Sequence, residues 1–337
     1  MNPLPIRTRR STFFILSFLT TTLFAFSSAA PNRVQQASVT NAQAASPVAF
    51  GLLKLTVTVS TKNGLFVAGL TKDNFTVLEG KTPREISHFS DAKMPASIGV
   101  LVDVSKSMMP QKVNAAKYVA ASFIEQSHPE NEYFISEFSN DLYELVGWTR
   151  DAREITEGLH KLGTATIKDD EKQKPKPHGL TALYDSCAVA LDKVARGSYP
   201  KHVLLLITDG RDTKSRISLE KIRQRIKESD VLIYGIDFSE REDLSTFGVV
   251  GRSILDELAA ISGGRTFSPK TKSEIDEVAE RIALELQQQY VIGFVPLNSA
   301  QGGKWNKVKI KVTPPDAAVG NLSVRSREGY FSPMSAP

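Results

Sequence analysis

The chain has 337 residues, of which 41% are apolar and 23% are charged, and its formal net charge is +5. This balance is typical of a soluble globular protein with one large or two ordinary domains, and it excludes a low-complexity or charge-dominated chain. The single cysteine excludes an internal disulfide.

Residues 1–29 have the pattern of a secretory signal peptide. Three arginines within 7–10 precede the apolar stretch 13–26, and small residues follow it, with cleavage simplest after Ala29. Removal of these arginines lowers the net charge to +2, and no cluster of Lys and Arg interleaved with aromatics is visible, so we expect no nucleic-acid partner. An uncleaved membrane anchor is the alternative, although the stretch is short for a spanning helix. The sequence therefore predicts a secreted, periplasmic or cell-envelope protein, attached to a membrane only if the leader stays uncleaved.

The next segments predict a linker and then a β segment. Residues 30–47 are rich in Ala, Ser, Asn and Gln and show no strong periodicity, as in a linker. From 48 to 95, apolar and polar residues alternate in short runs such as 53–59, which are separated by turn-forming residues. We expect an N-terminal β segment over 48–95.

From 96 to 289, apolar strands alternate with amphipathic helices. This pattern predicts a doubly wound α/β domain, with a mostly parallel sheet covered by helices on both faces. Strands are expected at 98–103, 132–138, 142–146, 202–208 and 231–237. Helices are expected at 111–127, 151–162, 181–196, 218–229, 252–262 and 272–289. The last helix carries an apolar stripe at helical spacing that should pack on the sheet. The stripe consists of Ile275, Val278, Ala279, Ile282 and Leu286.

Strand character returns after residue 289. The expected strands lie at 290–294, 308–312, 322–325 and 329–331. Such lone strands need partners, and the natural partners are the strands before residue 95. We therefore expect 290–332 to pack with 48–95 in a small β-sandwich, into which the α/β domain is inserted. Two separate β pieces are the alternative.

Five oxygen-bearing side chains follow predicted strands or begin a predicted helix. Asp103, Ser105 and Ser107 come directly after the first strand of the α/β domain, and their hard oxygens suit a small divalent cation. Thr181 opens a helical pattern, and Asp209 ends another buried-type strand. Ligands of an open α/β sheet bind beyond the carboxyl ends of the strands, where strand order reverses, so we expect these residues to meet there. Taken singly, each of them is also explained as a helix cap or a turn residue.

The order of these motifs carries a resemblance. An Asp-x-Ser-x-Ser sequence, a later Thr and a later Asp-Gly resemble the metal site of von Willebrand factor type A domains. The flanking segments add looser motifs, namely Gly69-Leu70-Thr71 with Phe75, Glu79-Gly80-Lys81, Tyr290 to Phe294 with Pro296, and Arg327-x-Gly329-Tyr330-Phe331. With these, nearly the whole mature chain resembles the bacterial family called acidobacterial VWFA-related proteins. Little biochemistry comes with that family beyond its domain type.

The resemblance implies a metal-ion-dependent adhesion site (MIDAS) for Mg²⁺, with Mn²⁺ or Ca²⁺ as alternatives. It implies that Ser105 and Ser107 coordinate directly, Thr181 directly or through water, and the two carboxylates partly through water. Because hydroxyls are neutral, the ion would keep positive character and capture an Asp or Glu of a protein partner. The implied function is exported, metal-dependent protein binding in adhesion or another interaction.

Other functions are weighed against this one. A structural envelope protein with a stabilising metal is one alternative, and a metal-dependent hydrolase is another. No Gly-x-Ser-x-Gly elbow, phosphate-cradling loop or base-like His near the motif is visible, so we expect no enzyme. We further expect Cys187 to be a small buried apolar residue, Asp237 to form a turn, and Asp185 to favour its helix dipole.

Overall fold

The computed structural model describes residues 51–91, 93–108, 110–164, 179–239, 246–296, 303–314 and 320–332, with only the backbone described for 246–249. All of them belong to one compact unit, Val48–Pro337. The predicted leader 1–29 and linker 30–47 lie outside the described residues.

A six-stranded sheet with the order β10-β9-β8-β5-β6-β7 lies at the centre of the α/β part. Its strands are β5 (Ser97–Asp103), β6 (Glu132–Phe138), β7 (Leu142–Thr149), β8 (His202–Thr208), β9 (Leu232–Asp237) and β10 (Arg265–Phe267). All neighbours run parallel except β6 and β7. Every residue of β5 is buried, which explains its continuous apolar run. Strand order reverses between β5 and β8, so a ligand crevice is expected beyond the carboxyl ends of these two strands.

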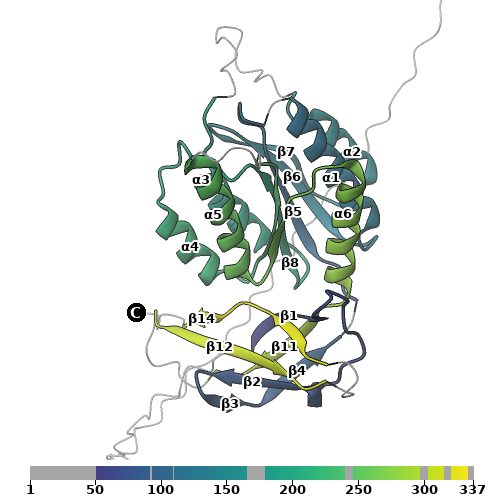
Figure 1. The fold of residues 1–337 in the computed structure, drawn as a ribbon, viewed down its shortest axis with the longest axis vertical. Helices are drawn as coiled ribbons and strands as arrows, with labels where there is room; N and C mark the ends of the chain where they lie inside the picture. The colour runs from purple at the N-terminus through teal and green to yellow at the C-terminus, as the bar shows by residue number, and fades with distance from the viewer. Residues whose placement is uncertain are drawn as a thin grey trace, which may run out of the picture. The chain divides into compact units, whose positions relative to one another are not determined.

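In the described part of the chain, three helices cover each face of this sheet (Figure 1). One face carries α1 (Gln111–Gln126), α2 (Ala152–Lys161) and α6 (Lys272–Gln287), and the other carries α3 (Leu183–Val194), α4 (Leu219–Glu228) and α5 (Thr246–Ser262). Val100 contributes to the first core and Leu101 to the second. Successive residues of one strand thus supply opposite cores, as the period of two requires.

Polar side chains fix where three of the helices begin. Asp151, Ser218 and Thr271 precede α2, α4 and α6, and each accepts a backbone N–H from the first turn of its helix. Such caps satisfy one of the donors that a helix start leaves unpaired.

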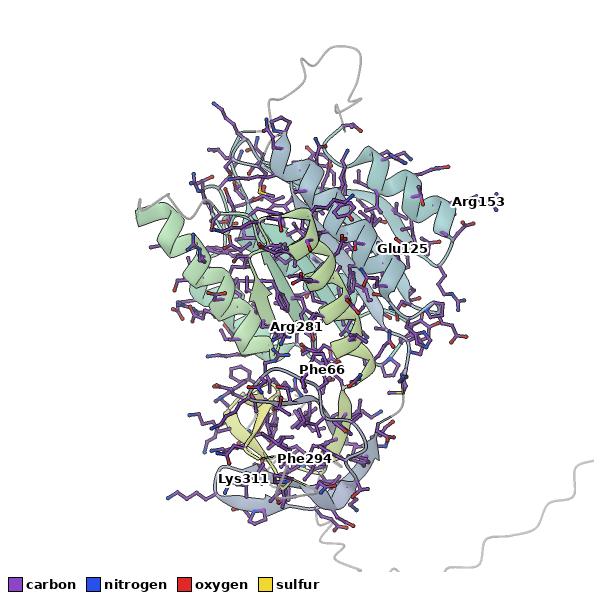
Figure 2. The ribbon with its side chains drawn as sticks, turned by 45° about the vertical axis from the view of Figure 1, so that its right-hand side comes forward. Phe66, Glu125, Arg153, Arg281, Phe294 and Lys311 are labelled. Atoms are coloured by element: carbon purple, nitrogen blue, oxygen red, sulfur yellow. The ribbon has the colours of Figure 1, made fainter. Side chains whose placement is uncertain are left out.

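Strands from both ends of the chain form a β-sandwich of two antiparallel sheets (Figure 1). One sheet has the order β13-β1-β11-β4, with β1 (Leu53–Thr61), β4 (Ile86–Ser90), β11 (Tyr290–Phe294) and β13 (Leu322–Arg325). The other has the order β14-β12-β2-β3, with β2 (Phe75–Glu79), β3 (Thr82–Arg84), β12 (Trp305–Val312) and β14 (Gly329–Phe331). Both sheets contribute to one apolar core. Figure 2 shows Phe294 inside the sandwich and Lys311 on its outer side.

The predicted fold class is confirmed, both for the α/β sheet and for the β-sandwich from the flanking segments. Because β1 pairs with β11 and also with β13, the alternative of two separate β pieces is wrong. The sequence does not predict β10, a three-residue strand that includes the polar Arg265 and Thr266. In addition, α5 begins at Thr246 rather than at 252. The domain boundaries at 95 and 289 stay predictions.

Cys187 lies on α3 and is fully buried, as expected. Burial raises the pKa of its thiol to about 12, and only the thiolate reacts readily with alkylating agents. We therefore expect iodoacetamide at pH 8 to leave the native protein unlabelled, while the chain unfolded in guanidinium chloride takes up one label, as measured by mass spectrometry. Rapid labelling of the native protein would contradict this burial.

Candidate metal centre

The five predicted ligand residues lie on segments that meet at the carboxyl ends of β5 and β8. Asp103 is the last residue of β5, and Ser105 and Ser107 follow it. Asp209 directly follows β8, which pairs with β5. Thr181 lies just before α3, and its backbone bonds to the loop that follows Asp209. They therefore lie at the sheet edge where strand order reverses, the edge at which open α/β sheets bind ligands.

Asp103 is fully buried, and both of its carboxylate oxygens accept hydrogen bonds. The backbone N–H of Ser105 donates to Oδ1 at 2.8 Å, and the hydroxyl of Thr208 donates to Oδ2 at 2.7 Å. Burial, followed by the negative charge of Asp209, raises the pKa of Asp103 to about 7. Two neighbouring carboxylates away from water repel each other, so a cation between them would stabilise both.

The two serine hydroxyls lie side by side. Ser105 Oγ and Ser107 Oγ are 3.2 Å apart, Ser105 is buried and Ser107 is half-buried. Two oxygens bound to Mg²⁺ at about 2.1 Å on adjacent octahedral positions would be roughly 3 Å apart. The hydroxyl spacing therefore fits two such ligands. Lys106, between them, is exposed to solvent.

Asp209 keeps an oxygen available. Its Oδ1 accepts the backbone N–H of Arg211 at 3.3 Å, whereas Oδ2 is buried and has no hydrogen-bond partner among the described residues. The Nε atom of Arg211 forms an ion pair with Oδ2 at 3.6 Å, a distance too long for a hydrogen bond. A buried carboxylate oxygen without a partner is costly, so this atom is a fitting ligand for an ion or an ion-bound water.

Thr181 is fixed through its backbone. Its N–H donates to the hydroxyl of Thr213 at 2.9 Å, and its carbonyl accepts from the N–H groups of Thr213 and Lys214. The contacts within the described residues bring Thr181 beside the loop after Asp209, but they include no bond from its side chain to the other four ligands.

A backbone crossing lies directly behind Asp209. Gly210 has φ 79°, and a Cβ atom on it would come within 2.4 Å of the carbonyl oxygen of Gly251 in α5. Any larger residue would strain the backbone and push against α5, so Gly210 helps to hold the position of Asp209.

Sequence reasoning missed several supporting residues. Thr208 could have been noticed as the hydroxyl next to Asp209, but its bond to Asp103 spans 105 positions. Asp185 lies in the first turn of α3, as expected of an acid that favours the helix dipole, and it also accepts the backbone N–H groups of Arg216 and Ile217 and so holds the loop beside Thr181. Asp237 forms a turn as predicted, because its Oδ1 accepts the N–H of Ser239 at 2.7 Å.

The donor set consists of two carboxylates and three hydroxyls. Among the residues that the structure describes, no group of three or more His, Cys, Asp or Glu side chains could hold a metal. Hydroxyls and carboxylates are hard oxygen donors, which suit Mg²⁺, Mn²⁺ or Ca²⁺ better than a soft transition metal.

No helix in the described ranges has the length and apolar character needed to cross a membrane.

Residues 98–211 match the family model for the von Willebrand factor type A domain. No curated protein matches this chain in sequence. Among solved structures, the chain is similar to a von Willebrand factor type A protein from Catenulispora acidiphila, with 12% identity, a TM-score of 0.46, and coverage of 85% of this chain and 75% of that one.

Two further structures are similar over a shorter part of the chain. The vWF domain of the type V pili tip protein Mfa5 from Porphyromonas gingivalis has 12% identity and a TM-score of 0.44, covering 58% of this chain and 97% of that one. An aerotolerance-related membrane protein from Bacteroides fragilis has 13% identity and a TM-score of 0.45, covering 57% and 98%.

Proposed function

Taking residues 98–211 as a von Willebrand factor type A domain, we propose that the chain is an exported protein-binding module of MIDAS type that works through a divalent cation. The proposed ligands of Mg²⁺, with Mn²⁺ or Ca²⁺ as alternatives, are Asp103, Ser105, Ser107, Thr181 and Asp209. The proposed partner is a protein that presents an Asp or Glu side chain. Export rests on the predicted leader 1–29, and the proposed location is the periplasm, the cell envelope or the medium.

One observation carries the proposal. Asp209 Oδ2 is buried without a hydrogen-bond partner among the described residues, at the same strand ends as the buried Asp103. The nearest positive charge in the described residues, the Nε of Arg211, forms an ion pair with this oxygen at 3.6 Å, too long for a hydrogen bond. A cation accounts for its orphaned state and for the burial of two neighbouring carboxylates.

The residues of the site have different roles in binding. Asp103 is held by Ser105 and Thr208, and Asp209 by Arg211, so both carboxylates are positioned before any ligand arrives. The hydroxyls of Ser105 and Ser107 supply neutral oxygens. When bound, the cation supplies a positive charge with one coordination position left for a carboxylate of the partner. Because the bond forms in a sheltered crevice, it should be stronger than a surface salt bridge.

The rim of the site favours an acidic partner with an apolar neighbour. Leu180, next to Thr181, keeps 49% of its surface exposed, and Lys106 is exposed between the two serines. An exposed apolar side chain next to Thr181, together with an exposed positive charge between the two serines, suits a segment in which an acidic residue is flanked by an apolar one.

The proposal is tested by capture of partners from an envelope extract of the source organism. The immobilised protein should retain a set of partners in millimolar Mg²⁺ that is lost in EDTA and lost with Asp103→Asn. The control variant Asp192→Asn, an exposed acid on α3, should keep the set. If Asp103→Asn lowers stability while leaving the partners unchanged, the metal only stabilises the fold and the binding function is wrong.

A further inference from the structure

A cavity lies away from the candidate metal centre, on the amino-terminal side of β8 and β9. It measures about 150 Å³, and its walls include Pro200 and Lys201 before β8, Asp230 before β9, and Arg327 after β13. The opposite wall is the outer face of the sandwich sheet β13-β1-β11-β4. Its volume is about ten times what a single water needs.

The register of the sandwich sheet brings two basic side chains to this wall. Lys54 on β1 is opposite Gly293 on β11, and Gly293 is opposite His88 on β4. Both Lys54 and His88 line the cavity. A Cβ atom on the glycine between them would come within 2.9 Å of the Cβ of His88 and 3.0 Å of Leu52, so the glycine lets these side chains pack closely over β11.

Lys201 is a buried cation without a carboxylate partner. Only 3% of the residue is exposed, and its Nζ donates to the carbonyl oxygen of Leu286 at 2.5 Å. An ammonium group has three donors, and that carbonyl is the single acceptor found for it within the described ranges. Burial lowers its pKa to about 8, and no acidic residue offsets the effect.

Arg327 is half-buried and also has an unused donor. Its Nη1 donates to the carbonyl oxygen of Ser229 at 3.1 Å, while its Nε is buried and has no hydrogen-bond partner in the described part of the chain. Burial lowers the pKa of this guanidinium, and the negative charge of Asp230 opposes part of that effect. The acidic group of the cavity, Asp230, is shared with the ring of His202, whose Nδ1 lies 3.1 Å from Oδ1.

The walls therefore carry more positive than negative charge. Lys54, Lys201 and Arg327 are cationic, His88 adds a titratable ring, and Asp230 is the one carboxylate that lines the cavity in the described residues. Buried cations need paired anions, and Lys and Arg donors together are the usual ligands of oxyanions.

We propose that this cavity binds one small tetrahedral oxyanion, of the phosphate or sulfate class, between Lys54, Lys201 and Arg327. The anion would accept the unused donors of Lys201 and the Nε–H of Arg327. It would also join β1 of the sandwich to residues at the amino ends of β8 and β9. The site does not share a residue with the candidate metal centre, so it does not depend on the proposed function.

The test is thermal unfolding of the full protein in EDTA, with phosphate compared with chloride at equal ionic strength and pH. Phosphate at about ten times its dissociation constant should raise the melting temperature by roughly 3 °C. Sulfate should act like phosphate, and planar acetate should not. Calorimetric titration of phosphate into the wild-type protein should give one site per chain.

Variants locate the effect. Lys201→Met should lose the rise and Lys54→Met, at the exposed edge of the cavity, should reduce it. The matched control Lys311→Met lies on the outer side of the other sheet and should keep it (Figure 2). Asp103→Asn should also keep it, which separates this site from the metal centre. If Lys201→Met does not fold, the melting temperatures of Lys54→Met and the calorimetric titration of the wild-type protein test the proposal. The proposal would be overturned if phosphate did not raise the melting temperature of the wild-type protein more than chloride does. It would also be overturned if phosphate raised the melting temperatures of Lys54→Met and Lys201→Met as much as that of the wild-type protein.

Discussion

Millimolar Mg²⁺ or Mn²⁺ should raise the melting temperature of the wild-type protein by roughly 5–10 °C compared with EDTA. The variant Asp103→Asn should not show this rise. An ion present at about 100 times its dissociation constant stabilises the folded state by about 2.7 kcal/mol. The ion would relieve the repulsion between Asp103 and Asp209, which are both buried. Asn at position 103 keeps an oxygen for the N–H of Ser105 but lacks the charge.

The same melts without metal distinguish the site from ordinary caps and turns. In EDTA, Asp103→Asn should be at least as stable as the wild-type protein, because it removes one of two neighbouring buried charges. If Asp103 only closed a turn, Asp103→Asn would be less stable than the wild-type protein. Metal would then change the melting temperature of neither protein. Asp192→Asn serves as the control and should retain the full metal-dependent rise. A wild-type protein indifferent to Mg²⁺, Mn²⁺ and Ca²⁺ would refute the metal site.

Glu285→Gln should lower the free energy of unfolding by roughly 3 kcal/mol, the second large effect that we expect. Glu285 on α6 is fully buried, and it accepts hydrogen bonds from Thr58 on β1 and from Tyr234 on β9, at 3.2 and 2.7 Å. Its carboxylate also forms ion pairs with Arg265 and Arg325. Without this charge, two partly buried guanidinium groups would lose the anion that they share.

The expected value lies at the lower end for a broken buried ion pair because the side chains of Arg265 and Arg325 keep 28% and 26% of their surface exposed. Urea unfolding followed by circular dichroism measures the change. Glu280→Gln, an exposed acid on the same helix, should leave the midpoint within experimental error. A midpoint for Glu285→Gln equal to that of Glu280→Gln would show that the cluster contributes no net stability.

The sequence predicts the central sheet well because its strands are nearly continuous apolar runs, as in β5 and β8. It also brings the ligand candidates to one edge, since the carboxyl ends of parallel strands meet there. What it does not predict is which polar groups pair. The Thr208 hydroxyl on Asp103 depends on the pairing of β5 with β8, and the Oδ2 of Asp209, which has no hydrogen-bond partner among the described residues, depends on the path of the loop after β8.

Glu285 shows why sequence patterns do not predict buried polar clusters. It lies three positions after Ile282, on the same stripe of α6 that packs on the sheet, yet hydropathy assigns a glutamate to solvent. Its neighbour Leu284 is 39% exposed, the reverse of what hydropathy suggests. The partners that make burial tolerable come from β1, β9, β10 and β13, and no local pattern indicates them.

The pairing of β1 with β11 and β13 also sets the order in which the chain can fold. Thr58 and Glu285 are 227 positions apart, so β1 leaves the ribosome long before any of its partners exist. The α/β sheet can form from contacts between nearer elements, while closing so long a loop has an entropy cost that must be met before the sandwich is complete. Until then β1 and β2 have unpaired edges that can associate with other chains. A truncation that removes β11 to β14 should therefore yield aggregates, a consequence for synthesis and quality control rather than for binding.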